Sequence, residues 1–202
     1  MTDRLHIFAS AGPDLEVERE VIGKAIASLP VPLGWVIKYT PVRGERVAPA
    51  LDAVAASHFY VLVLGGDIRA PVGSELYVAR QTGKKVLAFL KNVLRTPAAH
   101  VFVKDASLEW EYFRAADELG PLLQRALIEQ VLEGAQTYGL SPVDWETLSA
   151  LLVDLADQEK LEREQEKAAP SYRGAGKDAV IVAPGRDLPE EGVLIEKQDG
   201  PA

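Results

Sequence analysis

A glutamate close to the start of a predicted helix is the residue of this chain best suited to chemistry. Glu75 lies in the segment Gly73-Ser74-Glu75, beyond a buried apolar run and a glycine-rich connection. A carboxylate there could attack or stabilise the anomeric carbon of a nucleoside, because the transition state for cleavage at that carbon resembles an oxocarbenium ion. Ser74 could orient the carboxylate or bind a ribose hydroxyl. A glutamate in the first turn of a helix also complements the helix dipole, and the sequence leaves both interpretations open.

Two further loops carry residues suited to ligand binding. In the glycine-rich connection, Gly66 permits unusual backbone angles, Asp67 could bind ribose hydroxyls and Arg69 could pair with phosphate. Near the N-terminus, the small residues Ser10 and Ala11 would let a ligand approach the backbone and the free amides of the helix that follows. For each loop a purely structural role is the alternative, since tight connections also need small residues and helix caps.

The elements that must position these loops follow from the alternation of apolar runs with helical patterns. The predicted strands are 5–9, 35–39, 59–64, 85–90 and a weaker one at 108–112. Strands that alternate with helices predict βαβ units and a parallel sheet with right-handed crossovers. We therefore predict an α/β fold with a flavodoxin-like, doubly wound, five-stranded parallel sheet of order 2-1-3-4-5. The three loops should meet at the carboxyl ends of its strands, where such sheets keep their ligand crevice.

The helices of this region are less sharply defined than its strands. Asp14 is predicted to cap the first helix, whose apolar face runs from Leu15 to Leu29. A second helix should end near Ser57, and the third should cover about 73–82, with Glu75 in its first turn.

Beyond residue 113 the pattern changes, so we expect three regions: the α/β domain at 1–113, a helical extension at 114–167, and 168–202 as a linker with a small hairpin tail. In the extension, Pro121 is predicted in the first turn of one helix, and Ser141-Pro142 should open the next. The extension is expected to pack on the α/β domain or on a partner. The hairpin would pair 179–182 with 192–195.

The composition excludes several classes of function. The 202-residue chain has no cysteine, which rules out disulfides, thiolate metal sites and cysteine nucleophiles. Its three histidines are scattered, so we expect no metal site. The net charge of -8 argues against salt-driven binding of nucleic acid. No run approaches the roughly 18 apolar residues of a membrane span, and no signal peptide is evident, so we expect a cytoplasmic protein without a membrane partner.

The spacing around Glu75 resembles the nucleophile helix of nucleoside 2-deoxyribosyltransferase-like proteins. In that family a glutamate precedes an alanine by four residues and a Gly-Lys pair by eight, as Glu75 precedes Ala79 and Gly83-Lys84 here. Lys85 departs from the family's usual proline. The resemblance implies that Glu75 lies where the family's nucleophile lies.

The N-terminal motifs have a second resemblance. Ile7-Phe8-Ala9-Ser10, followed by Asp14-Leu15-Glu16-x-Glu18-Arg19, resembles bacterial TIR-like domains of unknown function that are often fused to signalling NTPases. Ala11 replaces a residue that carries a hydroxyl in that pattern. Both groups share the flavodoxin-like topology, and TIR domains place a glutamate on the corresponding helix to cleave NAD. The resemblance covers about residues 4–112.

The resemblance implies a nucleotide- or nucleoside-binding TIR-like domain that acts as an N-glycosidase, an NAD hydrolase or a deoxyribosyltransferase-like hydrolase. Glu75 would be the catalytic carboxylate, and Ser10, Asp67 and Ser74 would position ribose or phosphate. No cofactor is required, and NAD or a nucleotide would be the substrate or ligand. The alternative is a non-enzymatic signalling or protein-interaction module, acting as a homo-oligomer or with a signalling protein. A third is a domain that keeps the fold but has lost the site.

Overall fold

Five parallel strands form one sheet in the computed structural model, which describes residues 5–31, 35–41 and 45–168. Their order is β2-β1-β3-β4-β5, and every neighbouring pair is parallel. The predicted flavodoxin-like order is therefore confirmed. The strands are β1 (Leu5–Ala11), β2 (Trp35–Tyr39), β3 (Phe59–Leu64), β4 (Lys85–Lys91) and β5 (Trp110–Phe113).

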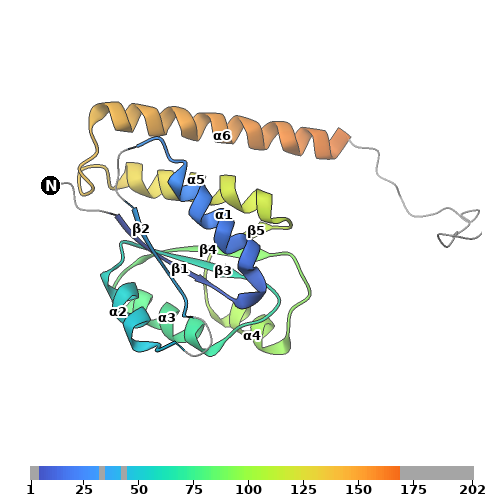
Figure 1. Cartoon of the computed structure of the whole chain (residues 1–202). Coiled ribbons are helices and arrows are strands. Elements are labelled where there is room, and N and C mark those ends of the chain that lie inside the picture. The colour runs from blue at the N-terminus through green and yellow to red at the C-terminus, as the bar shows by residue number, and fades with distance from the viewer. Residues whose placement is uncertain (1–4, 32–34, 42–44, 169–202) are drawn as a thin grey trace, which may run out of the picture. The chain divides into compact units, whose positions relative to one another are not determined.

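Helices cover both faces of the sheet (Figure 1). In β3 at the centre, Phe59, Val61 and Val63 point towards the face covered by α1 and α5, and Tyr60 and Leu62 point towards the face covered by α2, α3 and α4. All six residues of this strand are buried, as expected of a central parallel strand covered on both faces. The helices are α1 (Glu16–Ala27), α2 (Ala48–Ala56), α3 (Ala70–Gln81), α4 (Pro97–Asp105), α5 (Ala116–Glu133) and α6 (Pro142–Ala168).

The start of α3 corrects the prediction for Glu75. The helix begins at Ala70, three residues before the predicted start, with Pro71 in its first turn. Proline fits there because its missing N–H would have no partner within the helix at that position. Glu75 therefore lies in the second turn, and the first turn of α3 holds no acidic residue.

Two other helix starts also differ from the predictions. Asp14 is not the cap of α1, since it lies in a short 3-10 turn, Pro13–Leu15, that precedes the helix. Helix α5 begins at Ala116, so Pro121 lies inside it rather than in its first turn. Full burial of Leu119 explains the earlier start, because the apolar face that packs on the sheet extends upstream of the proline.

Helix α6 begins as predicted. The Ser141 hydroxyl accepts a hydrogen bond from the Asp144 amide at 3.2 Å, which caps the helix. Leu148 is buried in the core cluster, and Leu151, Leu152 and Leu155 pack against it. The chain divides into two compact units, Met1–Glu159 and Lys160–Ala202, and all the strands belong to the first. The predicted hairpin at 179–182 and 192–195 lies outside the described residues. Among the described helices, none is long and apolar enough to cross a membrane.

Candidate functional site

The side chain of Glu75 reaches from α3 to the carboxyl ends of β1 and β2. The Ser10 hydroxyl, near the end of β1, donates a hydrogen bond to Glu75 Oε2 at 2.6 Å. The Thr40 hydroxyl, directly after β2, donates to the same oxygen at 2.9 Å. Glu75 and Ser10 are both 0% exposed, and Thr40 is 8% exposed. We call Ser10, Thr40 and Glu75 the carboxylate–hydroxyl cluster.

Each hydroxyl of the cluster has one proton to donate. Ser10 donates to Glu75 Oε2, and Thr40 Oγ1 lies within hydrogen-bond distance of both Glu75 Oε2, at 2.9 Å, and Ser10 Oγ, at 3.1 Å. The other oxygen, Glu75 Oε1, is buried and has no hydrogen-bond partner among the described residues. Oε2 of the carboxylate is therefore held by hydroxyl groups, whereas Oε1 is available to accept a hydrogen bond.

Opposing effects act on the protonation of Glu75. Burial raises the pKa of its carboxyl group above the ordinary value of 4.5, because the charged form loses its hydration. The hydrogen bonds from Ser10 and Thr40 and the charge of Arg19 act against this rise, since each favours the ionised form. Perturbation by burial and by specific partners is typical of functional carboxylates, although structural networks show it as well.

Tyr60 adds a second buried polar atom on the same face of the sheet. Its ring stacks on Phe8, with 6.0 Å between the centroids. Its hydroxyl is buried and has no hydrogen-bond partner within the described ranges. Burial raises the pKa of the Tyr60 phenol, the nearby Ser10 hydroxyl opposes that shift, and the Glu75 carboxylate adds to it. Tyr60 therefore stays a protonated phenol on the face of the sheet that α3 covers.

The position of Glu75 argues against the helix-dipole interpretation. Dipole effects fall off within the first turn of a helix, and Glu75 lies in the second turn. The side chain also does not point into solvent, because both of its hydrogen bonds run to residues of other elements.

The loop between β1 and α1 packs closely on the loop after β3. Asp14 accepts a hydrogen bond from the Gly66 amide at 3.1 Å, which links two loops 52 residues apart. A Cβ added at Gly65 would lie 2.5 Å from Asp14 Oδ2 and 3.1 Å from Leu15 Cδ2. A side chain at position 65 would therefore displace the Asp14 carboxylate that accepts from the Gly66 amide, and Asp14 joins two loops instead of capping its own helix.

Helix α1 is also tied to the strands on both sides of β1 and β3. Glu18, only 2% exposed, pairs with Lys91 at the end of β4, with 2.6 Å between Oε1 and Nζ. Arg19 donates to the Thr40 carbonyl at 2.9 Å, just beyond β2. Asp14, Glu18 and Arg19 belong to the motif that carries the resemblance to TIR-like domains. In this structure they join α1 to the carboxyl edge of the sheet.

Within the described ranges, the other predicted site residues make no hydrogen bond to the side chains of the cluster. Asp67 accepts from the Thr96 hydroxyl and from the Ile68 amide, each at 2.9 Å, and it is exposed. Arg69 and Ser74 are exposed, and Ala11 is buried at 2% exposure. Among the described residues, Glu75 hydrogen-bonds only Ser10 and Thr40. The structure thus brings Ser10 and Glu75 together, whereas Gly66 and Asp67 form a neighbouring loop contact.

Three residues of the site were not predicted from the sequence to belong to it: Thr40, Tyr60 and Arg19. Thr40 follows from the strand order only once the register of β2 against β1 is known. Tyr39 of β2 is paired with Ala9 of β1, so the next residues, Thr40 and Ser10, are neighbours. The roles of Tyr60 and Arg19 depend on side-chain contacts between elements, which no local sequence pattern predicts.

Comparison of the chain with protein-family models, with curated proteins and with solved structures found no match. Within the described ranges, no three His, Asp or Glu side chains are grouped so that they could hold a metal ion. Fold and site together define a flavodoxin-like α/β protein with a buried carboxylate–hydroxyl cluster at the carboxyl edge of its sheet.

Proposed function

We propose that this chain is a TIR-like, nucleotide- or nucleoside-binding domain in which Glu75 cleaves the N-glycosidic bond of NAD or a related nucleoside. One observation carries the proposal. Glu75 is held through Oε2 alone, by hydroxyls from the ends of β1 and β2, and buried Oε1 has no partner among the described residues. The carboxyl edge of a doubly wound sheet is also where such folds bind their ligands.

The proposed reaction needs one carboxylate and one water. The bond between the anomeric carbon and the base breaks, and its electron pair leaves with the base, which for NAD departs as neutral nicotinamide. Positive charge then develops on the ribose, and Glu75 Oε1 stabilises it. Water adds to the anomeric carbon and gives up a proton, to solvent in the case of NAD, which yields ADP-ribose, or to the departed base in the case of a neutral nucleoside. The hydroxyls of Ser10 and Thr40 keep the carboxylate ionised and aligned through Oε2.

Burial sets a condition on this chemistry. Because Glu75 is 0% exposed, a ribose reaches Oε1 only when the residues that cover it separate. Desolvation strengthens the attraction between the carboxylate and the developing cation once the ligand has replaced the cover. We therefore expect turnover to be limited by opening of the site, as in many enzymes with lids.

The test is release of base by the purified chain. We expect the chain to release nicotinamide from NAD, or base from a nucleoside, and Glu75→Gln to lose about 100-fold or more of that activity. Glu109→Gln is the matched control, because this exposed glutamate precedes β5 at the opposite edge of the sheet. No release by either protein, or equal release by the chain and Glu75→Gln, would contradict a catalytic Glu75.

A second candidate function is a signalling or protein-interaction module without turnover. The full burial of Glu75 favours it, since a carboxylate closed off from solvent can serve as a polar anchor between α3 and the strands. This candidate predicts nucleotide binding or self-association with no release of base. Light scattering over a concentration series tests the assembly, and a monomer at every concentration would contradict self-association.

A further inference from the structure

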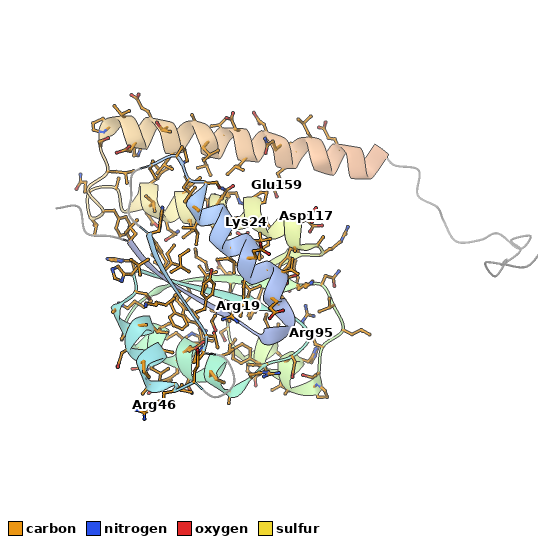
Figure 2. The ribbon with its side chains drawn as sticks, viewed as in Figure 1. Arg19, Lys24, Arg46, Arg95, Asp117 and Glu159 are labelled. Atoms are coloured by element: carbon orange, nitrogen blue, oxygen red, sulfur yellow. The ribbon has the colours of Figure 1, made fainter. Side chains whose placement is uncertain are left out.

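Arg19 lies outside the carboxylate–hydroxyl cluster but is bonded to the backbone of one of its members. It extends from α1 towards the sheet (Figure 2). Its Nη2 donates to the Thr40 carbonyl at 2.9 Å, and its guanidinium lies over the Tyr39 ring, 5.1 Å from the centroid. The Tyr39 hydroxyl in turn donates to the Arg19 carbonyl at 3.3 Å. The end of β2 and the first turns of α1 are therefore joined by three contacts.

These contacts hold Thr40 at a point where the sheet holds it weakly. Thr40 lies beyond the last residue of β2, and its amide makes one hydrogen bond, to the Ala9 carbonyl at 3.2 Å. Arg19 fixes the carbonyl of the residue whose hydroxyl must point at Glu75. A rotation of the Thr40 backbone that broke the bond to Arg19 would also carry this hydroxyl away from the carboxylate.

We propose that Arg19 is a positioning residue of this site, which clamps the end of β2 on α1 and so keeps the Thr40 hydroxyl on Glu75 Oε2. The importance of this clamp for function rests on the proposed function, whereas its existence does not. It gives Arg19 a role apart from contact with any ligand.

Four elements place polar or charged groups around Glu75: Ser10 from β1, Thr40 after β2, Tyr60 from β3 and Arg19 from α1. Arg19 acts on the carboxylate in two ways, through its charge and through its hold on Thr40. Both favour the ionised form. Lysine in place of Arg19 keeps the charge but loses the planar fork that bonds the carbonyl and stacks on the ring, so Arg19→Lys separates the two effects.

The experiment is a carboxyl ¹³C NMR titration of the full chain labelled at glutamate, with the Glu75 signal identified by its loss in Glu75→Gln. We expect the titration midpoint of Glu75 to rise in Arg19→Gln and to rise less in Arg19→Lys. In a Thr40→Val background, Arg19→Lys should add no further rise, because the hydroxyl it would release is already gone. Lys24→Gln is the control, since Lys24 is an exposed cation of the same helix, paired with Glu20 at 2.9 Å.

Amide hydrogen exchange gives a second readout. Exchange at the Thr40 amide should be faster in both Arg19 variants and unchanged in Lys24→Gln. If the Glu75 midpoint and the Thr40 exchange rate in Arg19→Lys both equal those of the parent chain, the charge at position 19 is sufficient and the clamp is overturned. If the Glu75 midpoint in Arg19→Gln equals that of the parent chain, any role for Arg19 is overturned. Neither measurement depends on turnover, so inactivity towards NAD would defeat the proposed function and leave this test intact.

Discussion

Replacing Ser10 by alanine should destabilise the protein more than the loss of an ordinary buried hydroxyl. The Ser10 hydroxyl is 2.6 Å from Glu75 Oε2, a length typical of a bond to an ionised acceptor. Such bonds contribute about 1.5–3 kcal/mol, against about 1 kcal/mol for a neutral bond. Ser57 is the matched control, because it is also buried and its hydroxyl donates to a neutral group, the Val54 carbonyl, at 2.8 Å.

The assay is urea unfolding of the two variants and of the parent chain, at a pH where Glu75 is ionised. We expect the free energy of unfolding to fall by about 1.5–3 kcal/mol in Ser10→Ala and by about 1 kcal/mol in Ser57→Ala. In a Glu75→Gln background the Ser10→Ala loss should shrink to that of Ser57→Ala, because the charge that strengthens the bond is gone. Equal losses for Ser10→Ala and Ser57→Ala in the parent chain would refute the ionised, hydroxyl-held carboxylate.

Three further predictions concern stability. Glu75→Gln should raise the free energy of unfolding at neutral pH. Because burial raises the pKa of Glu75 in the folded protein, the stabilising contribution of this side chain is complete below pH 4.5 and is lost as the pH rises through the folded pKa. Unfolding curves across that pH range should show the stability gain of Glu75→Gln over the parent chain shrink as the pH falls. A gain that does not change with pH would contradict the prediction. Lys91→Met should lower the free energy of unfolding by about 3–5 kcal/mol in thermal or urea unfolding, because Glu18 is left charged and only 2% exposed. A loss no larger than that expected for an exposed ion pair would contradict this prediction. Gly73→Ala should stabilise by about 0.5–1 kcal/mol, since an added Cβ meets nothing within 4 Å in α3. Gly65→Ala should destabilise, because its Cβ would push the Asp14 carboxylate away from the Gly66 amide that it accepts from. Calorimetry of both variants checks the opposite signs.

The central strand shows what local sequence can determine. The run at 59–64 is continuously apolar and ends at Gly65-Gly66, so both its type and its bounds were predicted as observed. The strand order followed from the alternation of strands and helices, because right-handed crossovers leave few arrangements for five parallel strands.

Helix starts were harder to predict, because a proline can belong either to a connection or to the first turn of a helix. The third helix was predicted to begin at about residue 73, but α3 begins at Ala70 and Pro71 lies in its first turn. Helix α4 was not assigned at all, although Thr96-Pro97 is a cap followed by a first-turn proline, and the Thr96 hydroxyl accepts from the Ala99 amide at 3.2 Å. The helix is only nine residues long, so it gives a short window in which to recognise a helical pattern.

The site was only partly predictable for a different reason. Ser10 and Glu75 could be placed at one edge of the sheet, since both follow from strand ends and topology. Thr40 and Arg19 depend on the register of β2 against β1 and on a side chain that crosses from α1. Those contacts join residues far apart in the sequence, and they are decided by tertiary packing.

The most direct test of a ligand site at Glu75 is its carboxyl ¹³C signal during titration with ADP-ribose, which carries the ribose but lacks the bond to be cleaved. We predict a saturable change in the Glu75 signal that is weakened in Thr40→Val and retained in Lys24→Gln. Such a change would establish that a ribose reaches Glu75, whether or not turnover follows. A Glu75 signal unmoved at every ADP-ribose concentration would contradict the account.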